Sequence, residues 1–393
     1  MAKERTPTEM QNFLKNVKLI CTILSLGIIS GCWDIKEIEN INYVTTIGID
    51  YIDDSFVLYA QLLDFTAIAK TESGKTDKTP QVWIGKAKAK TLNLAMNDLY
   101  ASSQERTSWS HVSSIIIGEN ALKANVLKVD DLIGRFWEIR LTPWVFGTRE
   151  PIQRLLTVPA FFNFSQRNTL AQEPIEAFDQ RSLIEPVRYF QFLSRLWEPG
   201  TNILLPSLSI NSTTWKKDEK EDSKMFIDGA YIIDEGKLLG KLDNQKLLGI
   251  RWIDKSTIRS PIVISHQGED AAVLSLESPE VHMSISVING LPKYHFHIKL
   301  NGNVIETLQK VSKRKMESTA EEVVRNEVIN TFQNALAIKS DVYSLEHLLF
   351  RRKTAIWKEL KRSNEPVVNA HSISAVMVKV NINHAGMKIY PLK

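Results

Sequence analysis

The chain has 393 residues, with 49 lysines and arginines against 45 aspartates and glutamates and a formal net charge of +4. Hydrophobic residues make up 43% and charged residues 24%, which is typical of a folded chain and excludes a disordered one. Nucleic-acid binding usually needs a concentrated basic face, and a surplus of four positive charges is weak evidence for one. No nucleic-acid partner is therefore expected. The two cysteines, Cys21 and Cys32, exclude a disulfide framework and a four-thiolate metal site.

An uncharged apolar run covers residues 19–29, close to the start of the chain. Lys15 and Lys18 precede the run, and the small residues Ser30 and Gly31 follow it. A basic flank, a short apolar run and a small-residue exit are typical of a secretory signal. The run is too short to span a bilayer core, which takes about 20 residues. Residues 1–31 are therefore predicted to be a signal peptide, the alternative being a buried helix or strand that begins the fold.

The exit from this run matches the bacterial lipobox, and four residues form it: Ile29, Ser30, Gly31 and Cys32. The thiolate of Cys32 is a nucleophile that takes a diacylglyceryl group in thioether linkage. Small side chains at the two middle positions let a peptidase cut between Gly31 and Cys32, and the freed amine is then open to N-acylation. Two or three acyl chains anchor a protein stably where one is marginal. A chance Ser-Gly-Cys beside an apolar run is the alternative.

This assignment accounts for both cysteines. Cys21 leaves with the signal and Cys32 carries lipid, so no thiol remains for a nucleophile, a disulfide or a zinc site, which suits an extracytoplasmic location. Met10 precedes a more ordinary signal than Met1 does, so we hypothesise that Met10 is a real or alternative start.

Residues 32–160 are predicted to form an N-terminal α/β domain. Two β-rich runs flank a turn at residues 50–54 and predict a hairpin. A polar loop at 71–80 follows, then an amphipathic helix in which Leu92 and Met96 share a face. A buried strand is expected at 113–117, and a second helix through 127–140. Strands that alternate with helices predict helices packed on a sheet.

Residues 161–210 are interpreted as a second, smaller unit or an elaboration of the first domain, with a helix at 183–197. Residues 211–224 are charged and almost free of aliphatic side chains. They predict either a linker between domains or a long solvated hairpin loop.

Residues 225–393 are predicted to form a C-terminal α/β domain that begins with strands near 226–233. A hairpin pairs 281–288 with 294–300, and Ser318 with Glu321 is a candidate capping box for a long helix. A second helical stretch at 345–360 precedes a final strand whose valines alternate. The fold class is therefore mixed α/β or α+β, with several domains, each a β-sheet flanked by α-helices. In the last domain a long helix packs on a largely antiparallel sheet.

Few groups of residues suggest a catalytic or metal-binding site. His295 and His297 share a strand face and His282 lies on the expected partner strand, but no carboxylate completes a zinc site, so outward histidines are favoured. His111 lacks a serine–acid pair nearby and is expected to make a structural hydrogen bond. Basic clusters at 313–315 and 351–353 are expected to be solvated helix ends, with contact to anionic lipid as the alternative. No catalytic residue, cofactor or metal is predicted.

Several motifs carry a resemblance to a known family. The chain reads CWDIKEIE at 32–39 and IGID at 47–50, then HVSSIIIGE at 111–119. Further stretches at 229–242 and 376–380 extend the pattern to the C-terminal half. These segments resemble the spore-germination lipoprotein family, the GerC-like C subunits of nutrient germinant receptors in endospore-forming bacteria.

The resemblance implies a lipid-anchored, non-enzymatic subunit that is needed for the germination response to nutrients. It also implies assembly with two polytopic membrane subunits at the extracytoplasmic face of the spore inner membrane. The alternative is a lipid-anchored solute-binding protein of a membrane transporter, which should show two similar doubly wound lobes. An anchored cell-wall hydrolase is a third possibility and should show an acid pair or a metal triad in a cleft.

Overall fold

The computed structural model describes residues 7–29, 41–63, 81–363 and 365–384, and the chain divides into two units, Met1–Ile41 and Asn42–Lys393. Helix α1 (Pro7–Ile29) forms the described part of the first unit. The side chains of α1 that the structure describes, those of residues 10–12 and 14–22, are exposed. Within the described ranges, no helix is both long enough and apolar enough to cross a membrane.

The second unit opens with the expected hairpin. Strand β1 (Ile41–Ile52) pairs antiparallel with β2 (Ser55–Leu63). The turn residues Asp53 and Asp54 both have positive φ, at 49° and 52°. Two left-handed residues form the turn whose twist matches that of the strands, and aspartate tolerates that conformation.

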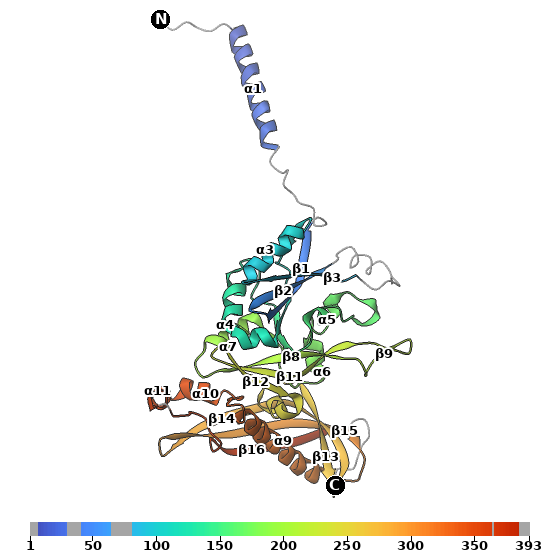
Figure 1. The fold of residues 1–393 in the computed structure, drawn as a ribbon, viewed down its shortest axis with the longest axis vertical. Helices are drawn as coiled ribbons and strands as arrows, with labels where there is room; N and C mark the ends of the chain where they lie inside the picture. The colour runs from blue at the N-terminus through green and yellow to red at the C-terminus, as the bar shows by residue number, and fades with distance from the viewer. Residues whose placement is uncertain (1–6, 30–40, 64–80, 364, 385–393) are drawn as a thin grey trace. The chain divides into compact units, whose positions relative to one another are not determined.

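The larger sheet has ten strands in the order β12-β11-β8-β6-β5-β1-β2-β3, with β4 beside β1 and β7 beside β6. Figure 1 labels β1, β2, β3, β8, β11 and β12 of this sheet. The neighbours β1, β5, β6 and β8 run parallel, and the outer strands are antiparallel. The remaining bounds are β3 Trp83–Ala89, β4 Arg106–Ser108, β5 Ser114–Gly118, β6 Trp144–Thr148, β7 Val187–Arg188, β8 Asn202–Asn211, β11 Lys224–Asp234 and β12 Lys237–Asp243.

Both faces of this sheet are buried, and successive residues of β5 divide between two cores. Ile115 and Ile117 pack with α3 (Leu92–Ser102), α4 (Glu119–Arg135) and α7 (Tyr189–Trp197). Ile116 packs on the other face with α5 (Ile152–Leu156). A parallel strand covered on both sides needs a continuous apolar run, which explains the run of isoleucines. The expected α/β arrangement is confirmed.

The second predicted helix is shorter than expected. It ends at Arg135 because Phe136 takes extended backbone angles, and residues 136–140 continue as turns. In the middle region α7 covers only the later part of the helix expected at 183–197, because residues 187–188 form the strand β7, and the neighbouring helices are short. They are η2 Phe161–Asn163, η3 Gln166–Asn168 and α6 Ile175–Gln180.

The prediction that residues 211–224 form a linker between domains is wrong. Strands β8 and β11 pair directly from Asn202 with Asp234 out to Asn211 with Lys224. The stretch between them is the outer end of this hairpin, where β9 (Lys216–Lys217) pairs with β10 (Lys220–Glu221). The charged side chains of residues 216–221 are exposed, in line with the alternative interpretation, whereas Lys224 is buried beside Asp222.

Strand β11 also corrects the expected start of the C-terminal domain. It belongs to the ten-stranded sheet, where its two faces serve different cores. Tyr231 and Ile233 join the core of the N-terminal helices, whereas Ala230 and Ile232 join the core of the C-terminal sheet. This one strand therefore ties the two cores together.

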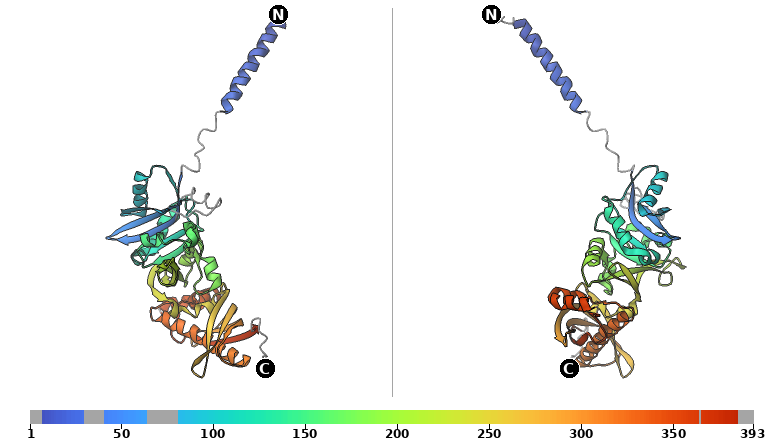
Figure 2. Two further views of the ribbon diagram at one scale, coloured as in Figure 1. Left: turned by 90° about the vertical axis from the view of Figure 1, so that its right-hand side faces the viewer. Right: turned by 60° about the vertical axis from the view of Figure 1, so that its left-hand side comes forward.

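The second sheet has four strands in the order β13-β14-β15-β16, namely Arg259–His266, Glu269–Ile288, Leu291–Thr307 and Ile373–His384. Only the β15–β16 pair is parallel. The long helix α9 (Lys313–Leu336) lies along this sheet in both orientations shown (Figure 2) and buries Ala320, Val324 and Val328 against it. A long helix on a largely antiparallel sheet is confirmed.

The ends of the C-terminal helices differ from those expected. Helix α9 begins at Lys313, and the Oγ of Ser312 accepts the cap hydrogen bond from the Lys315 amide at 3.3 Å. Ser318 lies inside the helix instead of capping it. The stretch expected at 345–360 breaks at Lys353 into two helices. The bounds of the elements not yet given are η4 Asn244–Leu247, α8 Ile250–Ile253, α10 Leu345–Arg352 and α11 Thr354–Ser363.

Candidate functional site

The lipobox begins where α1 ends. Ile29 is the last residue of α1, and Cys21 is exposed within the same helix. Ser30, Gly31 and Cys32 lie outside the described residues, as do the 32–39 motif and the 71–80 loop. Cleavage after Gly31 and lipidation of Cys32 therefore stay predictions.

Of the three histidines on β14 and β15, only two have their rings close to each other. His282 lies directly opposite His297 in the β14–β15 pair, and their ring centroids are 6.5 Å apart. The Nε2 of His295 instead shares a hydrogen bond of 2.9 Å with the hydroxyl of Ser286. In the part of the chain that the structure describes, no group of three or more histidine, cysteine or acidic side chains is placed to hold a metal ion.

His111 stands in a structural setting. Its Nδ1 lies 3.0 Å from the hydroxyl of Ser110, and its ring meets Tyr43 edge-on at 4.6 Å between centroids. Partial burial, with help from the positive charges of Arg140 and Arg167, lowers the pKa of His111. The lowered pKa favours the neutral imidazole, which can both donate and accept a hydrogen bond.

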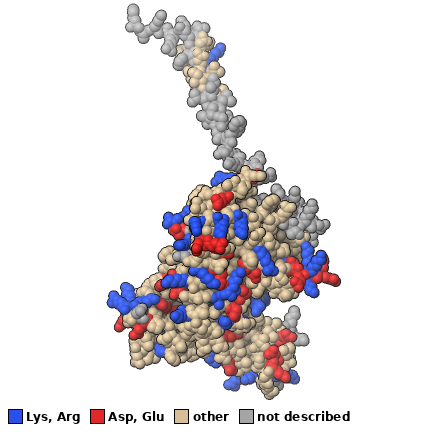
Figure 3. All heavy atoms as spheres, viewed as in Figure 1, with Lys and Arg blue, Asp and Glu red and all other residues tan. Residues whose placement is uncertain are grey.

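Figure 3 shows lysines and arginines interspersed with aspartates and glutamates over the face in view. The two basic clusters lie at helix ends, 313–315 in the first turn of α9 and 351–353 at the end of α10. Lys313 is 3.7 Å from Glu317 and so is partly neutralised.

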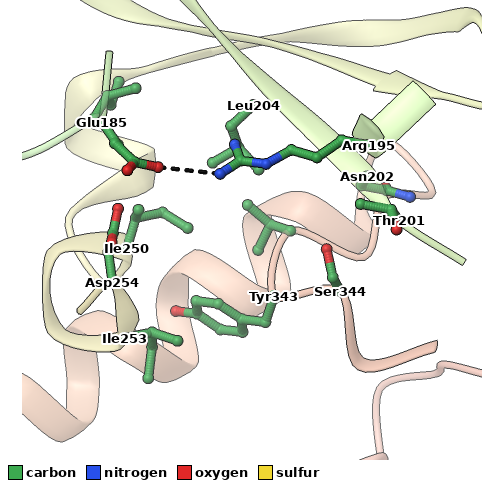
Figure 4. Close-up of a pocket in the computed structure, with 12 residues that line it drawn as sticks. Glu185, Arg195, Thr201, Asn202, Leu204, Ile250, Ile253, Asp254, Tyr343 and Ser344 are labelled. Carbon is green, nitrogen blue, oxygen red and sulfur yellow. Dashed lines mark hydrogen bonds and ion pairs between the residues drawn. The ribbon is translucent and has the colours of Figure 1, made fainter. Parts of the chain in front are cut away.

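A pocket of about 230 Å³ lies between the ten-stranded sheet and the elements of the C-terminal core, and we call it the seam pocket (Figure 4). Glu185 and Asp254 stand on one side of it, and Thr201 and Ser344 on the other. Its lining residues are Ile184, Glu185, Arg195, Thr201, Asn202, Leu204, Ile250, Ile253, Asp254, Val342, Tyr343 and Ser344.

One ion pair spans the seam pocket. An Arg195 guanidinium nitrogen lies 3.1 Å from a carboxylate oxygen of Glu185, and both side chains are about one-third exposed. Burial raises the pKa of Glu185, and the negative charge of Asp254 raises it further, whereas Arg195 opposes both. Asp254 in turn accepts hydrogen bonds from the amide and hydroxyl of Ser256, at 2.9 and 2.8 Å.

The buried amide of Asn202 fixes the wall of the pocket. Its oxygen accepts hydrogen bonds from the Ser340 hydroxyl and the Asp341 amide, both at 2.9 Å. Its nitrogen donates to Asp234 at 3.1 Å. Asn202 thus joins β8 and β11 of the larger sheet to the loop that follows α9. The adjacent Ser344 holds a left-handed conformation, with φ of 50°.

The acidic groups of the seam pocket are Glu185 and Asp254, which lie on the same side of it, and the charge of Asp254 adds to the raised pKa of Glu185. Among its described lining residues there is no histidine, cysteine or lysine, and the one arginine is already paired with a carboxylate. The pocket lies between two layers of the fold. Sequence reasoning missed it because its lining comes from segments 184–204, 250–254 and 342–344, which share no motif and meet only in the fold.

Two family models match the chain. A model described as the spore germination protein N-terminal domain matches residues 34–210, and one described as spore germination B3/GerAC-like, C-terminal, matches residues 228–386. The chain belongs to this GerC-like spore germination family.

Relatives and a solved structure agree with the family assignment. The chain is 22% identical to YfkR and 19% identical to spore germination protein KC, both of Bacillus subtilis (strain 168). The two matches cover 94% and 95% of this chain and 97% of each relative. The crystal structure of the GerBC protein matches with a TM-score of 0.51 at 16% identity, covering 87% of this chain and 97% of that one, which shows a shared fold.

The family assignment leaves the transporter alternative without support. Both matched models describe spore germination proteins. The ten-stranded mixed sheet and the four-stranded, largely antiparallel sheet are also unlike each other, whereas a solute-binding protein should show two similar doubly wound lobes.

Proposed function

We propose that this GerC-like chain is a lipid-anchored, non-enzymatic subunit of a spore germinant receptor and that the germination response to nutrients requires it. The observation that carries the proposal is continuity along the chain. A lipobox ends at Cys32, and a germination family model begins at residue 34 and is followed by a second model up to residue 386.

The proposed mechanism is tethered assembly. Diacylglyceryl and N-acyl chains on Cys32, palmitate among them, hold the folded body at the extracytoplasmic face of the spore inner membrane. Confinement to that surface raises the effective concentration of its faces against two polytopic membrane subunits. The signal then passes through protein contacts.

The test compares two cysteine variants in an endospore-forming host from which the gene has been deleted. Cys32→Ala removes the lipid acceptor and is expected to release the chain from the membrane fraction or leave it unprocessed, with the nutrient response lost. Cys21→Ala is the matched control, because it changes a cysteine that leaves with the signal, and it is expected to restore a normal response.

Mass spectrometry of the membrane-bound chain reads the modification directly. An unmodified Cys32 at the mature N-terminus, or membrane retention of Cys32→Ala at native size, contradicts the anchoring. A deletion strain that germinates normally on every nutrient but loses solute uptake or growth contradicts the receptor role.

A further inference from the structure

A second pocket, of about 400 Å³, lies beside helix α6 and is lined almost entirely by apolar side chains. We call it the α6 pocket. Strands β6, β8 and β11 supply one wall through Phe146, Pro206 and Ile227, and α6 supplies Ala177 and Phe178. A pocket of this volume with an apolar lining and few polar groups has the make-up of a small-molecule site.

Only two polar side chains occur among the described residues that line the α6 pocket, Arg181 and Asn244. Arg181 is exposed, and its guanidinium has no hydrogen-bond or ion-pair partner among the described residues. The Asn244 side chain donates to the Ile227 carbonyl at 2.8 Å, and its own oxygen is buried without a partner. The pocket therefore offers one unneutralised positive charge at an apolar cavity.

We propose that the α6 pocket binds a small apolar monocarboxylate, with its hydrocarbon body in the cavity and its carboxylate on Arg181. A guanidinium matches a carboxylate with two parallel hydrogen bonds. The single positive charge of Arg181 balances the single negative charge of a monocarboxylate, whereas a phosphate dianion would need a second positive charge. No acidic side chain lines the pocket within the described residues, so the amine of a free amino acid finds no counter-ion there.

The proposal is tested by calorimetric titration of the chain from residue 33 to 393, because residues 42–393 form one compact unit. The probes are hexanoate, octanoate and 1-hexanol. Octanoate is expected to bind roughly sixteenfold more tightly than hexanoate, or about fourfold for each added methylene. Hexanoate is expected to bind at least roughly tenfold more tightly than 1-hexanol because its charge is paired.

Three variants locate the binding. Arg181→Gln is expected to abolish the preference for the acid over the alcohol, and Ala177→Trp, at an exposed position of the lining, is expected to block octanoate. Arg314→Gln makes the same charge change on α9, far from the lining in sequence, and is expected to bind as the unmodified chain does. Octanoate that does not bind the unmodified chain, or that binds Ala177→Trp equally well, overturns the proposal.

An equal loss of binding in Arg314→Gln and Arg181→Gln also overturns the proposal, since it would show a general charge effect. Membrane anchoring and germination do not enter this titration. Its failure therefore leaves the receptor role standing, and failure of the Cys32 experiment leaves the α6 pocket standing.

Discussion

Replacing Asp341 by asparagine is expected to flatten the pH dependence of stability. This carboxylate is buried in the loop after α9, where one oxygen accepts the Glu346 amide hydrogen at 2.7 Å and the other has no partner. Burial raises its pKa to about 7, and the nearby charges of Glu346 and Asp234 add to the rise. In the unfolded chain the carboxyl titrates near its ordinary value of about 3.8.

The sign follows from proton linkage. Between about pH 4 and pH 7 the folded state holds a proton on Asp341 that the unfolded state has lost, so the free energy of unfolding falls as the pH rises through this window. A shift of about three units corresponds to a loss on the order of 4 kcal/mol, which is an upper bound because the loop can relax. Asparagine keeps an acceptor for the Glu346 amide and carries no charge.

Urea unfolding of Asp341→Asn and of the unmodified chain at pH 5 and pH 8 measures the effect. The variant is expected to gain stability relative to the unmodified chain as the pH rises from 5 to 8. Asp218→Asn, an exposed change in the β8–β11 hairpin, is the matched control and should follow the unmodified chain. If the difference between Asp341→Asn and the unmodified chain is the same at both pH values, the reasoning is refuted.

Two further substitutions test packing and charge. The nearly buried Arg251 lies 2.8 Å from Glu327, so Glu327→Ala leaves this arginine without its counter-ion and should lower the free energy of unfolding by about 3–5 kcal/mol. Lys88→Ala removes one partner of an exposed ion pair and should leave the unfolding midpoint in urea unchanged. Equal effects of the two would contradict this. Gly147→Ala places a Cβ 2.3 Å from the Tyr231 ring and should lower stability by about 1–3 kcal/mol, and an unchanged melting temperature would show that the ring moves freely.

Local patterns in the sequence predicted local structure well. The β1–β2 hairpin follows from two apolar runs around an aspartate-rich turn, and the last strand follows from alternating valines, of which Val378 and Val380 are buried. Both features depend on neighbours within a few residues. The same holds for α3, whose apolar positions repeat at helical spacing.

Non-local pairing explains the errors. The sequence does not indicate that β11 adds to the first sheet, because a strand that is apolar on both faces fits either sheet. The start of α9 was misplaced because Ser312 and Ser318 are both plausible caps, and only packing selects the first. The seam pocket and the α6 pocket were not predicted, since each gathers side chains from distant segments. The anchor at Cys32 rests on the sequence alone and stays a prediction.

The hairpin of β8 and β11 also limits how this chain can be divided. The two family models meet around residues 210–228, so a gene cut there would separate β8 from its hydrogen-bonded neighbour β11. Each fragment would then carry an unprotected strand edge, which invites aggregation. A cut placed after β12, near Asn244, keeps the whole sheet in one piece, although Ala230 and Ile232 would still lose their apolar cover from the second sheet.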